Sequence, residues 1–196
     1  MQPGKKRHPK TMFISGSAYE YGRFGDSGKD FIKDLSKALL KREFKLVSGF
    51  GLGVGTHIVE GALEEIYVEK KKKITDELCL FPFPLGNHTA PVWHSYRDHM
   101  LDEAGVALFI FGNKLEDISI KEADGVLKEF DIAYAKGSLL IPVGASGYAA
   151  ERLWKRVVEN YDDYFDTREK FELFLQLGTS PFRLESLIEL ILEIAN

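Results

Sequence analysis

Short apolar runs alternate along the chain with longer segments in which apolar residues recur at helical spacing. Five runs rich in β-branched and aromatic residues predict strands, at 11–15, 45–48, 77–81, 106–111 and 138–143. Strands that alternate with helices are typical of a mainly parallel sheet covered by helices on both faces. The pattern therefore predicts an α/β fold with a doubly wound, mainly parallel five-stranded sheet of Rossmann-like type.

Helical spacing places the connections between these strands. A first helix is predicted at about 29–42, with Ser27 and Asp30 arranged as in a capping box before it. A second helix follows Thr56, and a third lies between Ala123 and the helix-terminating Gly137. These helices connect strands that run in the same direction.

Beyond the last predicted strand the sequence becomes helical to its end. An amphipathic segment covers 148–161, Thr167 opens a second segment, and Ser180–Pro181 caps a third that runs through Ile194. This helical C-terminal tail packs on the sheet in the simplest arrangement. Its many Leu and Phe residues would also suit an oligomer interface.

Length and composition fit one domain. The chain has 196 residues, of which 44% are hydrophobic, and we expect a single domain over 10–196. The polar, basic stretch 1–9 reads as a leader, the edge of an expressed fragment or an interdomain linker, so the chain could be part of a longer protein. A net charge of −4 argues against a nucleic-acid partner.

Membrane and redox signals are few. No run approaches the roughly 20 apolar residues that span a bilayer, and no signal peptide is visible. The single cysteine, Cys79, lies inside an apolar run and reads as a buried thiol in a reducing compartment. These features predict a cytoplasmic protein.

A glycine-rich loop follows the second predicted strand. In Ser48-Gly49-Phe50-Gly51-Leu52-Gly53-Val54-Gly55, Gly49, Gly51 and Gly53 would let backbone N–H groups approach a phosphate at the start of a helix. Tight turns use the same residues, so that alternative stays open. The spacing matches neither the dinucleotide fingerprint at the first strand nor a P-loop.

Charged residues fall near other strand ends. The planar guanidinium of Arg97 and the ammonium group of Lys114 together suit a diphosphate, although both side chains could simply face solvent. Glu129 could accept hydrogen bonds from ribose hydroxyls, and by pattern alone it reads as a surface or capping glutamate. The spacing of His94 and His99 predicts no metal site, and no nucleophile elbow is present.

Four segments together resemble a known family. They are 15–17, 47–55, 96–100 and 111–114, and they resemble the SLOG domain of the ThsA family of Thoeris antiphage effectors from about 10 to 164. The resemblance implies that a sirtuin-like NADase domain precedes this domain in a full-length bacterial protein. It also implies that the domain senses a cyclic ADP-ribose isomer made by a partner TIR-domain protein.

The resemblance also implies roles for individual residues. Arg97 and Lys114 match the family's pyrophosphate-binding residues, and Glu129, preceded by Gly125, matches its acidic ribose contact. Gly16 and Ser17 match the first-strand loop of the pocket, and Leu85 falls in the loop that lines the base. By this resemblance the domain has no catalytic residue, metal or cofactor of its own, and it forms a homo-oligomer.

The wider relatives include LOG-type phosphoribohydrolases, which release adenine-type bases from nucleoside monophosphates. Arg97 and Glu129 look like their arginine and glutamate, but the glycine motif expected between these residues is replaced by 112–114 and the longer stretch 115–124. The leading expectation is therefore a sensor domain without NADase activity of its own. A phosphoribohydrolase and a structural oligomerisation module remain the alternatives.

Overall fold

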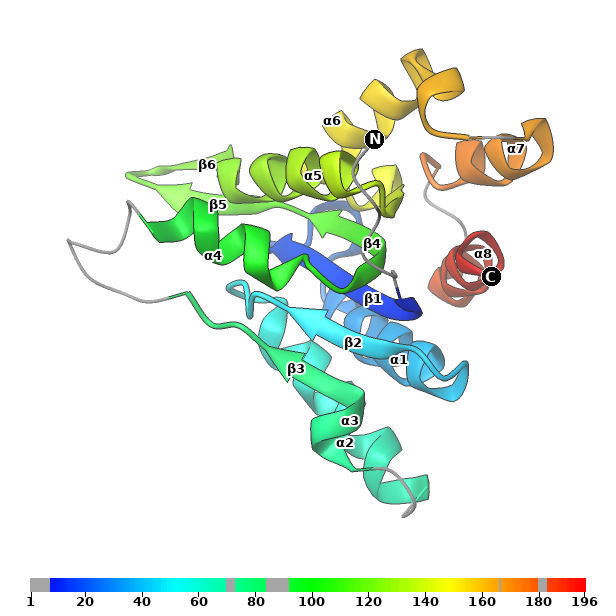
Figure 1. Cartoon of the computed structure of the whole chain (residues 1–196). Coiled ribbons are helices and arrows are strands. Elements are labelled where there is room, and N and C mark those ends of the chain that lie inside the picture. The colour runs from blue at the N-terminus through cyan, green and yellow to red at the C-terminus, as the bar shows by residue number, and fades with distance from the viewer. Residues whose placement is uncertain (1–7, 70–72, 84–91, 166, 180–182) are drawn as a thin grey trace.

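A central five-stranded sheet forms the frame of the molecule (Figure 1). The computed structural model describes residues 8–69, 73–83, 92–165, 167–179 and 183–196. The strands, in the spatial order β3-β2-β1-β4-β7, are β1 (His8–Ser17), β2 (Lys45–Ser48), β3 (Leu78–Leu80), β4 (Ala104–Phe111) and β7 (Leu139–Pro142). Each neighbouring pair in this sheet is parallel. The predicted doubly wound α/β fold is confirmed.

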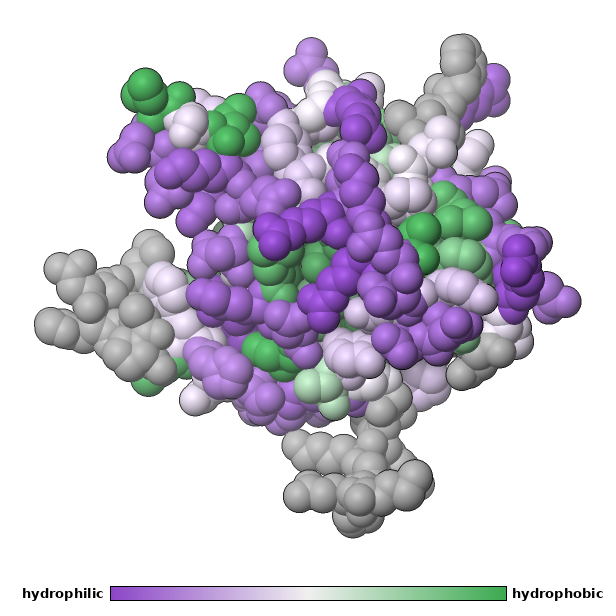
Figure 2. Space-filling model, turned by 90° about the horizontal axis from the view of Figure 1, so that it is seen from above, coloured by the Kyte–Doolittle hydropathy of each residue, from purple (hydrophilic) through white to green (hydrophobic). Residues whose placement is uncertain are grey.

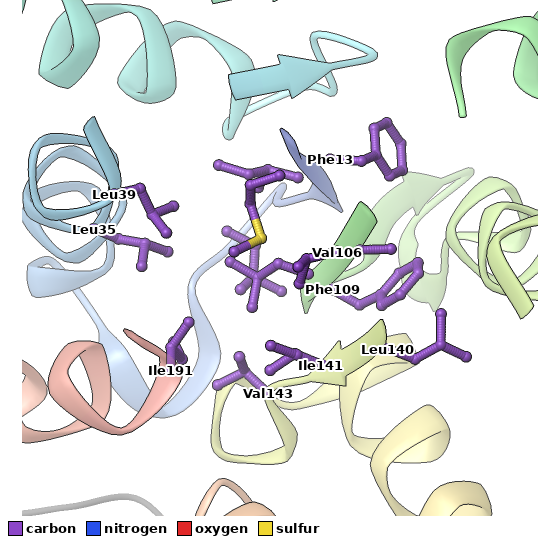
Figure 3. Close-up of a cluster of buried hydrophobic side chains, with 14 of the residues drawn as sticks. Phe13, Leu35, Leu39, Val106, Phe109, Leu140, Ile141, Val143 and Ile191 are labelled. Carbon is purple, nitrogen blue, oxygen red and sulfur yellow. The ribbon is translucent and has the colours of Figure 1, made fainter. Parts of the chain in front are cut away.

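Helices cover both faces of the sheet. One face carries α1 (Ser27–Lys41), α2 (Gly55–Glu69) and α8 (Leu184–Ala195), and the other carries α4 (Trp93–Met100) and α5 (Asp124–Lys136). Figure 3 shows Phe13, Phe109 and Leu140 on the α5 side, and Leu35, Leu39 and Ile191 between the sheet and the helices of the opposite face. Apolar strands are predictable here because helices bury both of their faces.

The chain after β7 packs against this sheet as the pattern predicted. It forms α6 (Tyr148–Glu159), α7 (Arg168–Gln176) and α8, with short 3-10 helices at Gly144–Ser146 and Tyr161–Asp163, whereas a further 3-10 helix, Gly22–Phe24, follows β1. Ile191 and Ile194 of α8 are fully buried, and α8 contacts α1 and β7. The tail therefore completes the core instead of extending from it.

Of the three predicted helix caps, one is wrong, one is confirmed and one lies outside the described residues. Ser27 is already helical in α1, and the preceding Asp26 makes no side-chain capping bond. Helix α8 begins at Leu184 behind Arg183, and the expected Ser180–Pro181 cap lies outside the described residues. The cap at Thr167 is confirmed, because its hydroxyl accepts a hydrogen bond from the Lys170 N–H at 3.4 Å.

Two short helices and a hairpin were not predicted. Helix α4 precedes β4, and a two-stranded hairpin of β5 (Asn113–Glu116) and β6 (Ser119–Glu122) follows β4. A one-turn helix, α3 (Ile74–Glu77), precedes β3. The eight residues of α4 are mostly polar or aromatic and bury just Arg97 and Met100, so they show no apolar helical period.

The surface corrects one further prediction. Cys79 is half-buried instead of buried, because β3 is an edge strand of the sheet.

The face seen in Figure 2 is mainly hydrophilic, with hydrophobic side chains in small, separate groups. Among the described residues, no helix combines the length and the apolar character needed to cross a bilayer.

Candidate functional site

A small cavity lies beyond the carboxyl ends of β1 and β2. Its volume is about 140 Å³, and it is lined by Ile14, Ser15, Gly16, Ser17, Gly49, Gly51, Phe83, Arg97, Ala123, Gly125, Val126 and Glu129. The strand order reverses between β1 and β4, and ligands of open α/β sheets bind at such a switch point. The topology thus brings residues from five separate parts of the chain to the usual binding edge.

The glycine loop after β2 lies directly against the loop after β1. A Cβ on Gly51 would fall 1.9 Å from the Gly16 carbonyl oxygen, and one on Gly53, at φ +68°, would fall 1.9 Å from that of Ala18. The Ala18 N–H donates to the Leu52 carbonyl at 2.7 Å. These glycines therefore allow close packing of two backbones, and that packing carries Gly51 to the cavity wall.

Glu129 is buried, which overturns its reading as a surface or capping residue. Its Oε2 accepts a hydrogen bond from the Ser15 hydroxyl at 2.6 Å, and its Oε1 lies 3.3 Å from Nε of Arg97. Burial raises the pKa of the Glu129 carboxyl, and the Ser15 hydrogen bond and the Arg97 charge oppose that rise. The cavity thus contains a carboxylate with both oxygens already held.

Arg97 reaches this carboxylate from α4. Its guanidinium carbon lies 4.7 Å from the ring centroid of Phe83 and 5.8 Å from that of Trp93, so two aromatic rings flank the cation. Nε contacts Glu129, and no other acceptor for this guanidinium occurs in the described part of the chain. A Cβ on Gly125 would sit 3.1 Å from Nη2, so a glycine there leaves the guanidinium room at the cavity wall.

Lys114 lies in the hairpin and does not line the cavity. Its Nζ is 3.0 Å from Oδ1 of Asp124, the first residue of α5, and 4.0 Å from the Glu116 carboxylate. The hydrogen bond to Lys114 is the main reason that the pKa of Asp124 falls to about 2, and Lys128 contributes to the same shift. The cation is thus engaged by a carboxylate beside the cavity-lining Gly125.

Asn113 fixes the loop that follows β1. Its fully buried side chain accepts hydrogen bonds from the backbone N–H groups of Tyr19 at 2.9 Å and Glu20 at 3.2 Å, and donates to the Glu20 carbonyl at 2.9 Å. Its own carbonyl accepts from the Ser17 hydroxyl at 3.0 Å. The start of the hairpin and one wall of the cavity are therefore joined at a single residue.

Most of the predicted site residues meet at this cavity. They are Gly16, Ser17, Gly49, Gly51, Arg97, Gly125 and Glu129. Gly53 and Lys114 do not line it, and Leu85 lies outside the described residues. Ser15 and Phe83 were not predicted as site residues. A hydroxyl at the end of an apolar strand was the available signal for Ser15, whereas nothing in the sequence distinguishes Phe83 from a core aromatic residue.

Two solved structures share the fold. TM1055, a structural-genomics target, superimposes with a TM-score of 0.56 at 16% identity, covering 94% of this chain and 99% of that one. The DNA processing protein A of Helicobacter pylori, whose single-stranded DNA binding has been described structurally, gives 0.50 at 15% identity, covering 94% and 81%. At these identities the similarity supports the fold alone.

Sequence relatives are more informative. Proteins named NAD(+) hydrolase ThsA match with 40% identity over 188 residues in Bacillus cereus (strain MSX-D12), 44% over 161 in Cytobacillus dafuensis and 36% over 196 in Enterococcus faecium. The matches cover 94%, 79% and 98% of this chain, but 39%, 33% and 40% of those proteins. The chain therefore spans about two fifths or less of the length of these relatives.

The model of the Sir2- and TIR-associating SLOG family matches residues 4–196, which is almost the whole chain. The match includes the glycine loop, α4 with Arg97 and α5 with Glu129. By this match, this chain belongs to the Sir2- and TIR-associating SLOG family.

Proposed function

We propose that this chain is the ligand-sensing domain of a larger antiphage NAD+ hydrolase, and that its ligand is a cyclic ADP-ribose isomer. The observation that carries the proposal is Arg97, a residue that is 8% exposed and lines a cavity walled by two glycine-containing loops. A planar guanidinium beside the backbone N–H groups of glycine loops is well suited to a diphosphate. The kinship with NAD(+) hydrolases supports an ADP-ribose type of ligand.

The size of the cavity limits how such a ligand could sit. Pockets for small molecules usually measure about 300 to 1,000 Å³, whereas this cavity measures about 140 Å³. It can enclose one phosphate or ribose group, with the rest of the ligand along the rim. We place a phosphate at Arg97, a ribose hydroxyl at the Ser15–Glu129 pair and the second phosphate within reach of Lys114 after its release from Asp124.

Regulation requires a difference in affinity between two states. A ligand activates an attached enzyme domain just to the extent that it binds the active arrangement more tightly than the inactive one. In our proposal a TIR-domain partner supplies the ligand in the bacterial cytoplasm. A sirtuin-like domain of the full-length protein, which we expect to form homo-oligomers, then responds to it.

Isothermal titration calorimetry with cyclic ADP-ribose isomers, ADP-ribose and NAD+ tests the proposal. We expect one cyclic isomer to bind. Arg97→Lys should weaken its affinity about tenfold to a thousandfold, because lysine keeps the positive charge beside Glu129 but lacks the planar guanidinium. The control is Arg168→Lys, which changes an exposed arginine of α7. Saturating ligand at about 100 times its dissociation constant should add about 2.7 kcal/mol of stability. An absence of binding or of any thermal shift would favour a purely structural module.

One observation favours a second candidate, a phosphoribohydrolase. Arg97 and Glu129 lie side by side in the cavity, and burial raises the pKa of Glu129 as in many general acids. Incubation with AMP or a cytokinin-type nucleotide separates the two candidates. Free base released at a catalytic rate, and abolished by Glu129→Gln, would favour the enzyme over the sensor.

A further inference from the structure

A second, larger hollow lies between the two last helices, far from the cavity in sequence. It has a volume of about 540 Å³ and is lined by Leu173, Gln176, Thr179, Ser186, Leu187, Glu189, Leu190 and Glu193. Figure 1 shows α7 and α8 together at one side of the molecule. We call this hollow the α7–α8 groove. The leucines of both helices form its apolar part, and glutamates of α8 border it.

The acidic border is not neutralised within the described structure. Glu185, Glu189 and Glu193 follow one another at four-residue spacing along α8, a helix without lysine or arginine. In the described part of the chain none of the three has an ion pair, whereas glutamates of α2 are paired, for example the exposed Glu64 with Lys37 at 2.5 Å. Like charges four residues apart destabilise a helix slightly, so this stripe carries a cost that a cationic partner would remove.

The opposite side of α8 is already used. Figure 3 shows Ile191 directed toward the sheet, and Ile191 and Ile194 are fully buried. Leu190 and Leu173, by contrast, are half-buried where they line the groove. The groove is therefore a separate surface of α8 with apolar area still accessible.

We infer that the α7–α8 groove is a docking site for a cationic amphipathic helix of a partner polypeptide. A third helix laid along two others buries apolar side chains at i, i+3, i+4 and i+7 between them. Lysines or arginines on the flanks of that helix would meet Glu189 and Glu193. Charge complementarity thus selects the sign of the partner, and the leucines provide the contact area. This inference does not depend on any nucleotide ligand.

A synthetic helical peptide of leucine and lysine, labelled with a fluorophore, is the probe. Fluorescence anisotropy should show saturable binding that weakens at high salt, and no binding of the matched peptide with glutamate in place of lysine. Glu189→Gln with Glu193→Gln should weaken binding about twofold to thirtyfold. The control pair Glu159→Gln and Asp162→Asn removes the same charge from exposed positions outside the groove.

The apolar contact needs its own variant. Leu190→Ala should weaken the lysine peptide about tenfold, whereas Leu175→Ala, at an exposed leucine of α7 outside the groove, should not. Circular dichroism checks that each variant keeps its fold. Equal weakening by the groove and control variants would mean general attraction to an acidic protein and would overturn the inference. The inference would also be overturned if the chain self-associates and Leu190→Ala abolishes that self-association, because the groove would then hold a second copy of the chain.

Discussion

The Ser15 hydroxyl donates a hydrogen bond of 2.6 Å to Oε2 of Glu129, joining the end of β1 to α5 across 114 positions of sequence. Arg97 engages the other carboxylate oxygen at 3.3 Å. The carboxylate therefore has a fixed orientation before any ligand arrives. A ligand hydroxyl that approaches Glu129 can use the remaining acceptor capacity of these oxygens without reorganising the side chain.

Ser15→Ala should destabilise the folded protein by about 1 to 3 kcal/mol, because Glu129 loses a hydrogen bond in a buried place. The same change should weaken nucleotide binding if the pair contacts a ribose. Urea unfolding and calorimetry measure the two effects. Ser36→Ala is the matched control, since its buried hydroxyl bonds within helix α1 to the Ile32 carbonyl. Equal losses in both variants would contradict a special role for Ser15.

The raised pKa of Glu129 gives a pH dependence with a defined sign. Because burial raises this pKa above the usual 4.5, the folded protein holds the proton more readily than the unfolded chain. The contribution to stability is complete below 4.5 and is lost as the pH rises through the folded value. Glu129→Gln cannot ionise, so we expect wild-type stability to fall relative to the variant as the pH rises from about 4.5.

Urea unfolding at a series of pH values measures this difference. The exposed Glu185→Gln provides the reference for a glutamate outside the site. Profiles for wild type and Glu129→Gln that stay parallel across the acidic range would contradict the raised pKa. The Arg97 charge opposes the rise in the pKa of Glu129, so the slopes of the two curves report the net direction of the shift.

Asp124→Asn should tighten the binding of a diphosphate ligand severalfold. Asp124 holds Lys114 at 3.0 Å and Lys128 at 3.1 Å, and its negative charge stands beside Gly125 at the cavity wall. Asparagine frees both lysines and removes a charge that repels phosphate. Calorimetry measures the affinity of both variants for the ligand, and Asp131→Asn, on the same helix, is the control. Unchanged or weaker affinity would mean that Lys114 does not contact the ligand.

The sheet was predictable because its strands are buried on both faces. Such strands must be apolar throughout, and β2 was predicted at its observed bounds, Lys45–Ser48. The short hairpin escaped prediction for the opposite reason. Ile118 is 99% exposed at its tip, so no burial constrains the pattern of residues there.

The candidate site was predictable in part. Gly16 and Gly51 could be selected because strand ends and helix starts are local features of the sequence, whereas Gly125 was selected through the family resemblance. The burial of Glu129 could not, since it depends on Ser15 and Arg97, which lie on other elements. Local patterns rank a glutamate as a surface residue, and only tertiary partners reverse that ranking.

Gly51→Ala should be among the most damaging single changes in the cavity wall. The added Cβ would fall 1.9 Å from the Gly16 carbonyl oxygen, which is backbone and cannot move alone. The two loops must separate, so we expect a loss of more than about 2 kcal/mol in unfolding free energy and weaker nucleotide binding. Gly25→Ala, where nothing lies within 4 Å and φ is +50°, isolates the backbone cost of about 1 kcal/mol. Equal losses of unfolding free energy in Gly51→Ala and Gly25→Ala would mean that the close contact with Gly16 adds nothing to the cost.

Asn113 provides the sharpest test of how the loop after β1 is held. Its Oδ1 accepts from two backbone N–H groups, and its Nδ2 donates to the Glu20 carbonyl at 2.9 Å. Asn113→Ala leaves all three groups without a partner, and we expect a loss of about 2 to 5 kcal/mol at any pH. Asn113→Asp keeps the acceptor but places a carboxylate oxygen against the Glu20 carbonyl.

The aspartate variant should therefore respond to pH in a direction that the alanine variant does not share. Repulsion from the carbonyl raises the pKa of the introduced carboxyl, so its proton is held more tightly in the folded state, and the protonated acid can donate where Nδ2 did. We expect Asn113→Asp to be strongly destabilised near neutral pH and to approach wild type at about pH 4. Urea unfolding of the three proteins at both pH values measures this. A deficit of the aspartate variant that stays constant with pH would mean that the donor bond to Glu20 contributes little to the position of the loop.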